Sequence, residues 1–258
     1  MNQANKSDSS TGARPSGTDG EDAAALAVRE MFDSIAPKYD LLNHLLSANI
    51  DRLWWWRAAR VFRSILRQPG ARVLDLCCGT GDMTLALLKH RPGEGCPIIA
   101  ADFAHQMLIR AERKFSSRNA SAARAITLEA DALHLPIADG SLDLVTSAFG
   151  FRNLANYDAG LAELHRVLRS GGEVGILDFS EPDGVMGKLY AFYFRHVLPA
   201  IGSRISGVTG PYAYLPSSVE RFPAPPLMLQ KLAQAGFRDA TWTPYTFGIA
   251  GLYRATKQ

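Results

Sequence analysis

Between residues 70 and 180, short runs of apolar residues alternate with longer segments whose apolar residues recur every three or four positions. Unbroken apolar runs of this length are typical of strands buried on both faces, and the longer spacing is typical of amphipathic helices. Strands that alternate with helices predict a parallel sheet flanked by helices, and right-handed crossovers make that sheet doubly wound. The five runs lie at residues 71–78, 97–103, 125–132, 142–150 and 172–180.

The alternation ends after Ser180. Residues 188–206 form a long aromatic stretch with a helical pattern, residues 210–222 show no regular pattern, and residues 225–236 predict a helix that ends at Gly236. Residues 240–257 predict two strands joined by a turn, an antiparallel hairpin at the sheet edge. The expected fold class is therefore α/β, a doubly wound, mostly parallel seven-stranded sheet with an antiparallel C-terminal edge hairpin and a helical lid.

The first 22 residues are rich in Ser, Gly, Asp and Asn and almost without apolar side chains. Such a segment buries too little surface to offset its ordering entropy, so we expect it to be disordered. It also lacks the apolar region of a secretory signal. Helical patterns follow up to Gln68. The expected organisation is a tail at 1–22 and a single domain at 23–258, made of a helical cap at 23–69, a core at 70–180, and a lid with the hairpin at 181–258.

Composition narrows the function classes. The formal net charge of the 258 residues is only +3, so no polyanionic partner is required, and we expect no nucleic-acid binding. Three cysteines are too few and too badly spaced for a disulfide framework, which favours a reducing cytoplasm. No run of about 18 apolar residues occurs, so no transmembrane helix is expected.

The stretch "VLDLCCGTGD", residues 73–82, places a glycine loop directly after the first predicted strand. In an open parallel sheet, ligands bind beyond the carboxyl ends of the strands, and glycines let the backbone approach a ligand closely. The loop matches a dinucleotide fingerprint poorly, because Thr84 stands at the third glycine position. The adjacent Cys77 and Cys78 have no Cys-x-x-Cys spacing, so we interpret them as packing residues and expect no metal.

Acidic residues follow the other predicted strands. Asp102 ends the second strand, where a carboxylate can accept hydrogen bonds from ribose hydroxyls, and Asp131 ends the third. Asp75, inside the first strand, is predicted to reach a ligand amine. Taken singly, each acid is better explained as a helix cap or a turn residue, but together on one rim they predict a cofactor site. The predicted cofactor-binding residues are Asp75, Gly79, Thr80, Gly81, Asp102, Asp131, Ala132 and Ser147.

These motifs resemble those of the class I S-adenosylmethionine-dependent methyltransferases, which have a Rossmann-like fold. Four further stretches are similar to the ubiquinone/menaquinone biosynthesis C-methyltransferase family: "FDSIAPKYDLLNHLLS", "SAFGFRNL", "HRVLRSGGEVGILDFSEP" and "FYFRHVLPAIG…YAYLPSSV". The resemblance implies S-adenosylmethionine as cofactor and C-methylation of a prenylated quinol, with demethylmenaquinol favoured over a 2-methoxy-6-polyprenyl-benzoquinol. Two departures are Asp51 and Asp178, which replace a His and a Glu of the family pattern.

The residues themselves suggest how such a ring would react. A quinol carbon becomes nucleophilic when the neighbouring phenol loses its proton, so the enzyme must position the ring, exclude water and accept a proton. Arg152 is predicted to stabilise the phenolate and Asn153 to orient the same oxygen. Tyr39, Asp40 and His196 are candidate proton acceptors. His196 alternatively serves as a hydrogen-bonded helix histidine, and Tyr39 and Asp40 alternatively cap and pack the N-terminal helix.

Two aromatic, arginine-containing stretches, Trp54–Arg67 and Tyr190–Leu198, are interpreted either as core helices or as a cover for a prenyl tail that touches the membrane surface. The protein is therefore expected in the cytoplasm, with peripheral contact at the inner face of the cell membrane, and a homodimer is considered. Two other functions stay open, namely methylation of another small lipid or aromatic compound, and cofactor-dependent regulation without catalysis.

Overall fold

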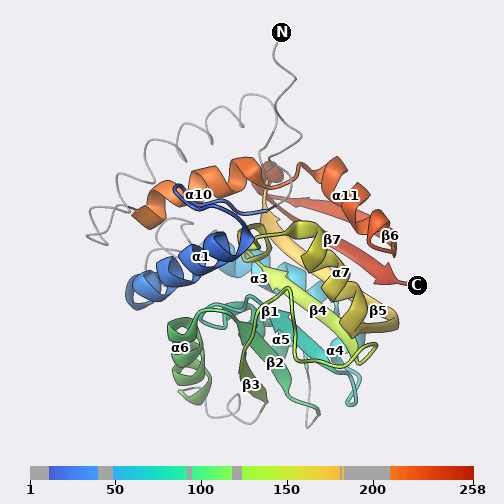
Figure 1. Ribbon diagram of the computed structural model, residues 1–258. Coiled ribbons are helices and arrows are strands. Elements are labelled where there is room, and N and C mark those ends of the chain that lie inside the picture. Colours follow the sequence, from blue (N-terminus) through green and yellow to red (C-terminus); the bar gives the residue numbers. More distant parts are fainter. Residues whose placement is uncertain (1–11, 40–48, 92–94, 118–123, 181, 183–209) are drawn as a thin grey trace.

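A seven-stranded sheet forms the centre of the molecule, as Figure 1 shows. The structure is a computed structural model. It describes residues 12–39, 49–91, 95–117, 124–180, 182 and 210–258. The strand order is β3-β2-β1-β4-β5-β7-β6. The predicted fold class is therefore confirmed. The strands are β1 Val73–Leu76, β2 Ile98–Asp102, β3 Ala125–Glu129, β4 Leu142–Ala148, β5 Leu168–Phe179, β6 Phe237–Tyr245 and β7 Ala250–Lys257.

The first five strands run parallel, and only β7 is reversed, between β5 and β6. All four residues of β1 are buried, as expected for a central strand covered on both faces. The predicted hairpin is formed by β6 and β7, and Pro244 lies in β6 at the sheet edge. An edge strand tolerates proline because one side of its backbone has no ladder to complete.

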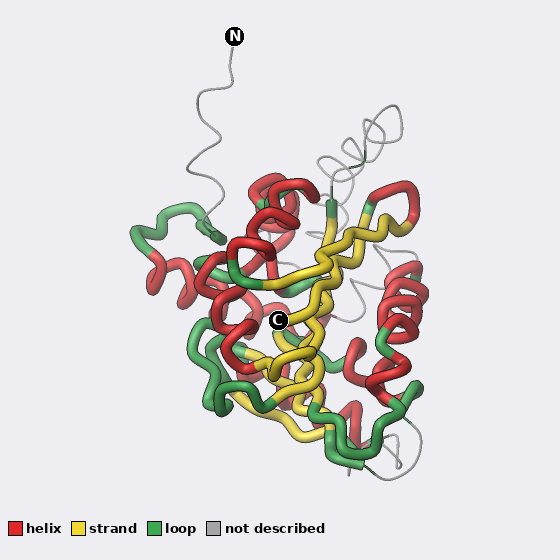
Figure 2. The backbone as a smooth tube through the Cα atoms, turned by 90° about the vertical axis from the view of Figure 1, so that its right-hand side faces the viewer, coloured by secondary structure: helices red, strands yellow, loops and turns green. Residues whose placement is uncertain are grey.

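Helices cover both faces of the sheet, as the side view in Figure 2 shows. One apolar core lies between the sheet and α3, α4, α5 and α6, and a second lies between the sheet and α7 and α11. The helices are α1 Glu21–Ile35, α3 Ile50–Val61, α4 Arg63–Leu66, α5 Asp82–Leu88, α6 His105–Ser116, α7 Tyr157–Val167, α10 Gly210–Arg221 and α11 Pro225–Gln234, with short 3-10 turns η1 Ala36–Lys38, η2 Phe151–Asn153 and η4 Thr246–Gly248.

The prediction of disorder up to residue 22 is wrong for its second half. Ala13 is only 2% exposed, and its N–H donates to Leu154 O over 2.7 Å. Helix α1 already begins at Glu21. The prediction of disorder used only the low apolar content of the segment itself. It could not include the hydrogen bonds and packing contacts that the segment makes with residues far away in the sequence. Residues 1–11 lie outside the described part of the chain.

The prediction of irregular structure at 210–222 is also wrong, because this segment forms α10 despite Pro216 inside it. Proline removes one backbone donor and normally breaks a helix, so the sequence favoured a loop. Here the C-terminal turns are anchored by buried Ser218 and Val219, so tertiary packing overrides the local preference. The predicted helix at 188–206 lies outside the described residues.

Candidate active site

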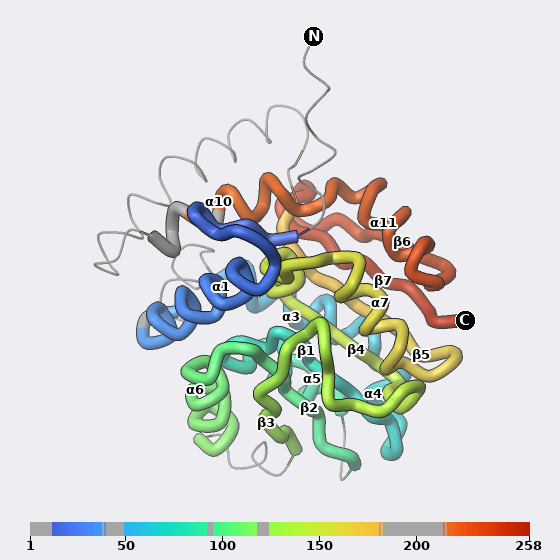
Figure 3. The backbone as a smooth tube through the Cα atoms, in the orientation of Figure 1, coloured from blue at the N-terminus to red at the C-terminus, as the bar shows by residue number. Residues whose placement is uncertain are grey.

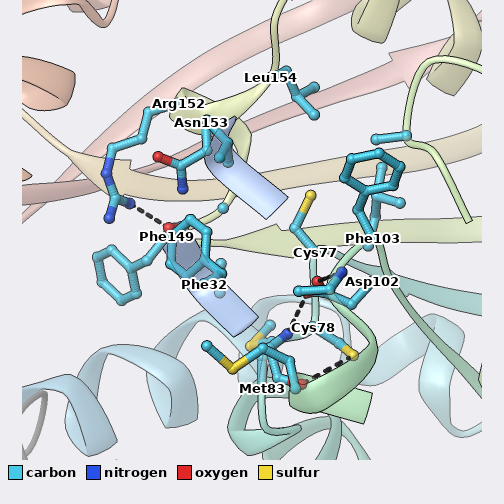
Figure 4. A pocket seen from close by; sticks show the side chains of 18 of the residues that line it. Phe32, Cys77, Cys78, Met83, Asp102, Phe103, Phe149, Arg152, Asn153 and Leu154 are labelled. Atoms are coloured by element: carbon cyan, nitrogen blue, oxygen red, sulfur yellow. Dashed lines mark hydrogen bonds between the residues drawn. The ribbon is translucent and has the colours of Figure 1, made fainter. Parts of the chain in front are cut away.

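A cavity of about 540 Å³ opens at the carboxyl ends of the parallel strands. Its wall includes the glycine loop after β1, the residues that follow β2, β3 and β4, and side chains from α1 and α3. Figure 4 shows Asp102 and Cys77 on one side of this space and Arg152, Asn153 and Phe149 on another. The cavity size suits a cofactor together with part of a second small molecule.

The glycine loop has the conformation that its glycines allow. Gly79 and Gly81 have φ angles of 54° and 87°, in the left-handed region. A Cβ atom on Gly81 would lie 2.6 Å from the ring of Phe115, whereas one on Gly79 would meet nothing closer than a Tyr39 ring atom at 3.8 Å. Gly81 therefore permits the loop to pack on α6, and Gly79 keeps the backbone open towards the cavity.

Asp102 lines the cavity and also fixes the loop. Its Oδ2 accepts a hydrogen bond from the Gly79 N–H at 2.8 Å, and its Oδ1 accepts from the Ala104 N–H at 2.9 Å. Burial raises the pKa of Asp102. The backbone donors lower the same pKa, but the effect of burial is larger. Each carboxylate oxygen retains a lone pair for a ligand hydroxyl, which is the arrangement that recognition of a ribose requires.

Asp75, for which the sequence predicts contact with a ligand amine, does not line the cavity. The side chain is fully buried, and its two oxygens accept hydrogen bonds from Thr84 Oγ1 at 2.6 Å and Thr146 Oγ1 at 3.0 Å. Burial raises the pKa of Asp75 to about 7. Its position inside β1 turns the carboxyl towards β4 and α5, so Asp75 joins these elements beneath the loop.

The remaining predicted cofactor residues divide into two groups. Thr80, Asp131 and Ala132 line the cavity, and Asp131 Oδ1 accepts from the Leu133 N–H at 2.9 Å. Gly81 and Ser147 do not contribute to the cavity wall. Ser147 is 1% exposed, so its side chain is buried within the protein.

Lys114 on α6 does not line the cavity but contacts two residues that do, and the sequence did not indicate it. Its Nζ donates to Thr80 Oγ1 at 2.9 Å and lies 3.0 Å from Asp82 Oδ2. Thr80 and Asp82 both line the cavity. The lysine is 32 residues from Asp82 along the chain, and no local motif marks it, so only the packing of α6 on the loop identifies it.

Arg152 and Asp178 form a buried ion pair at the other end of the cavity, with Nη1 and Oδ1 separated by 2.9 Å. The Arg152 N–H also donates to Asp178 Oδ2 at 3.1 Å, and the guanidinium contacts Phe149 O. Burial alone would lower the pKa of Arg152, but the Asp178 carboxylate raises it, so the guanidinium stays charged. The replacement of the family's Glu by Asp178 thus preserves a carboxylate partner for the arginine.

Asn153 and Tyr39 line the cavity as predicted. Asn153 Oδ1 is buried and accepts no hydrogen bond from any described residue. Tyr39 packs edge-on against Phe32 of α1, with ring centroids 6.1 Å apart. The structure therefore brings Tyr39, Arg152 and Asn153 to one cavity, whereas the predicted residues Asp40 and His196 lie outside the described chain.

Three aromatic rings enclose the same end of the cavity. Phe149 lies 4.6 Å from Phe179 and 5.7 Å from Trp54, measured between ring centroids. Arg152 lies over Phe179, with its guanidinium carbon 5.2 Å from the ring centroid. We call Trp54, Phe149 and Phe179 the aromatic cluster. Phe149 has a left-handed φ of 58°, a conformation that is costly for a bulky residue and typical of functional sites.

Cys77 and Cys78 line the cavity at the glycine loop, and Cys96 is exposed. Burial raises the pKa of both Cys77 and Cys78, which disfavours the reactive thiolate. Within the described chain, no group of three or more His, Cys, Asp or Glu side chains has the arrangement of a metal site.

The chain matches the model of the ubiE/COQ5 methyltransferase family over residues 19–257. It is 46% identical to the demethylmenaquinone methyltransferase of Thermus thermophilus over 224 residues, which cover 86% of this chain and 98% of that protein. It is 45% identical to the demethylmenaquinone methyltransferase of Deinococcus radiodurans over 233 residues, 90% of this chain and 93% of that protein.

A solved structure of a SAM-dependent methyltransferase from Aquifex aeolicus superposes with a TM-score of 0.58 at 19% sequence identity, covering 80% of this chain and 93% of that one. This likeness supports the class I methyltransferase architecture. With the family model spanning nearly the whole domain, the chain belongs to the ubiE/COQ5 methyltransferase family.

Proposed function

We propose that this enzyme transfers a methyl group from S-adenosylmethionine to a ring carbon of a prenylated naphthoquinol, with demethylmenaquinol as the expected substrate. The observation that carries the proposal is one cavity with two chemically different ends. The glycine loop and Asp102 form one end, and the aromatic cluster with Arg152 forms the other. The names of the Thermus and Deinococcus relatives favour the naphthoquinol over a benzoquinol.

The residues at the loop end fit the cofactor. Asp102 offers carboxylate oxygens for the ribose hydroxyls, Gly79 leaves room beside the backbone, and Asp131 with Ala132 lies where an adenine edge would be read. Thr80 completes this end and is held by Lys114. When bound, S-adenosylmethionine supplies an electrophilic sulfonium methyl group.

The residues at the aromatic end fit a flat, electron-rich ring. The aromatic cluster excludes water and orients the ring by stacking. Arg152, kept charged by Asp178, stabilises the phenolate that makes the ring carbon nucleophilic, and the free Asn153 Oδ1 orients the phenolic hydroxyl. Tyr39 lines the same cavity, with a ring atom 3.8 Å from the Cβ position of Gly79, and is our candidate for passing the phenolic proton towards solvent.

The proposal is tested with purified protein, cofactor labelled in its methyl group, and a panel of reduced acceptors. The panel contains a demethylmenaquinol, a 2-methoxy-6-polyprenyl-benzoquinol, a sterol and a small phenol. We expect label transfer to the naphthoquinol at the highest kcat/KM and to a ring carbon, located by mass spectrometry. Preferred transfer to the benzoquinol, sterol or phenol would reject the proposed substrate, and tight cofactor binding without any transfer would favour a regulator.

We further propose that the protein is cytoplasmic and meets its prenylated substrate at the inner membrane surface. No described helix combines the length and apolarity needed to cross a bilayer. Near the cavity, Leu53 of α3 is 51% exposed and Phe247 of η4 is 79% exposed. Trp54 Nε1 donates to Thr246 Oγ1 at 2.8 Å, which joins these two elements. Exposed apolar side chains beside a cavity mouth are typical of an interaction surface.

The charges on this side favour an anionic lipid surface. Helices α3 and α4 carry the predicted arginines, and Asp51 is 4% exposed. Arg57 lies over the ring of Tyr245, 4.3 Å from its centroid, next to the Phe247 turn. Each basic residue near an anionic surface contributes about 1 kcal/mol. The arginines of the two helices are Arg52, Arg57, Arg60 and Arg63, and Arg67 directly follows α4.

Co-sedimentation with phosphatidylglycerol vesicles tests this surface. The wild type should sediment at low salt and be released at high salt, and a Leu53→Ser/Phe247→Ser variant should stay in the supernatant. Ile126→Ser, which removes an equally exposed apolar side chain on β3, is the matched control and should sediment normally. Equal sedimentation of all three proteins would reject the surface. The considered homodimer stays a prediction, which light scattering after gel filtration would test.

A further inference from the structure

We propose that residues 12–18, which we call the N-terminal strap, position the turn that carries Arg152 and Asn153 and thereby contribute to quinol turnover. The effect on turnover rests on the proposed function. The strap lies outside the region matched by the family model, which begins at residue 19. Figure 3 shows this blue segment beside α10 and beside the chain that leads into α7.

The strap completes the hydrogen bonds of the turn. Leu154 O accepts from the Ala13 N–H at 2.7 Å, and Ala155 O accepts from Arg14 Nη1 at the same distance. Leu154 and Ala155 are buried, and both line the cavity directly after Asn153. Buried carbonyl groups need a partner, so the strap satisfies two acceptors that no regular element serves.

Close packing indicates that this contact is specific. A Cβ atom on Gly12 would lie 2.0 Å from Ala155 O, so only glycine fits at this position. Ala13 next to it is 2% exposed. The small residues that suggested disorder are therefore the ones that the narrow space between the strap and the turn requires.

Two further contacts hold the strap in place. Arg221 at the end of α10 donates to Arg14 O, and Arg14 Nη2 lies 3.7 Å from Glu21 Oε1. Asn156 Nδ2 donates to the same Glu21 oxygen at 3.1 Å. The strap thus joins α10, the first turn of α1 and the chain before α7, three parts that surround the turn.

On the opposite side, the turn is held by the buried pair, because Asp178 accepts from both the backbone and the side chain of Arg152. Arg152 and Asn153 are therefore fixed from within the sheet, and Leu154 and Ala155 are fixed from the strap. Loss of the strap frees one side only. We expect the turn to shift while the glycine loop and Asp102, which belong to other strands, stay in place.

Two strap variants test the proposal in the full-length chain. Arg14→Ala removes the side-chain donor, and Gly12→Val displaces the strap without changing charge. We expect faster hydrogen exchange in peptides covering residues 150–156. We also expect kcat/KM for the quinol to fall roughly tenfold to hundredfold, because a small misplacement of positioned groups lowers the rate by this amount. Cofactor affinity should stay within about twofold, in line with additivity between separate sites.

The controls separate positioning from folding. Arg14→Lys retains one donor and should recover part of the kcat/KM, and Ser16→Ala, on an exposed strap residue, should match the wild type. Unchanged exchange at 150–156 would overturn the proposal, as would a loss of protection throughout the molecule with a parallel fall in cofactor affinity. If the wild type methylates no quinol, the proposed function fails, but the exchange experiment still decides whether the strap holds the turn.

Discussion

At the scale of single residues, we expect cofactor recognition to depend most on Asp102. Asp102→Ala should weaken S-adenosylmethionine binding by about 1.5–3 kcal/mol, because a charge-assisted pair of hydrogen bonds is lost. Asp131→Ala should have a smaller effect, since the Asp131 side chain is 42% exposed and partly compensated by water. Calorimetric titration measures both affinities. Equal losses, or an unchanged affinity in Asp102→Ala with a normal melting curve, would contradict the assignment.

Arg152 pairs with buried Asp178 and is proposed to act on the quinol, and a single substitution would affect both roles. Arg152→Met should stop turnover, but it also leaves Asp178 buried and unpaired, which costs about 3–5 kcal/mol of folding stability. The double variant Arg152→Met/Asp178→Asn removes both charges and should regain most of that stability while turnover stays low. Chemical denaturation and steady-state kinetics measure the two effects. Recovery of turnover in the double variant would show that Arg152 serves the fold and not the quinol.

At the scale of elements, we expect two glycines of the loop between β1 and α5 to have different roles. Gly81 allows the loop to pack on α6, and Gly79 leaves space for the cofactor. Gly81→Ala should destabilise the fold by about 1–3 kcal/mol, because the new Cβ meets Phe115 of α6 at a left-handed φ. Gly79→Ala should cost about 1 kcal/mol in stability, because its Cβ has space, and should mainly reduce cofactor affinity. The opposite pattern in melting and titration experiments would reject the assigned roles.

At the scale of the whole molecule, buried Asp75 makes stability depend on pH. Its folded pKa of about 7 exceeds the unfolded value of 3.8, so the folded state holds an extra proton between these values. Folding stability should therefore fall as pH rises from about 4 to 7, by on the order of 4 kcal/mol at most from this group. Asp75→Asn should flatten that part of the profile, measured by urea denaturation across the range. An unchanged slope would contradict the raised pKa.

The sequence by itself determined in which order strands and helices follow one another along the chain in the core. It also determined where the glycine loop lies. Both are local properties, because the apolar period defines an element and a left-handed turn demands glycine. Asp102 could be predicted for the same reason, since the last residue of a parallel strand must lie at the ligand-binding edge.

Only the tertiary structure decided which partner each polar side chain meets. Asp75 precedes the glycine loop from inside its strand, whereas Asp102 ends its own, and Thr146, 71 residues away, occupies one of the Asp75 oxygens. Lys114 carries no local signal, the motif that contains Asp178 does not reveal its pairing with Arg152, and the N-terminal strap has a composition that predicts disorder. Contacts between distant residues depend on how the elements pack, because burial and hydrogen bonding are set by three-dimensional neighbours that no short stretch of sequence contains.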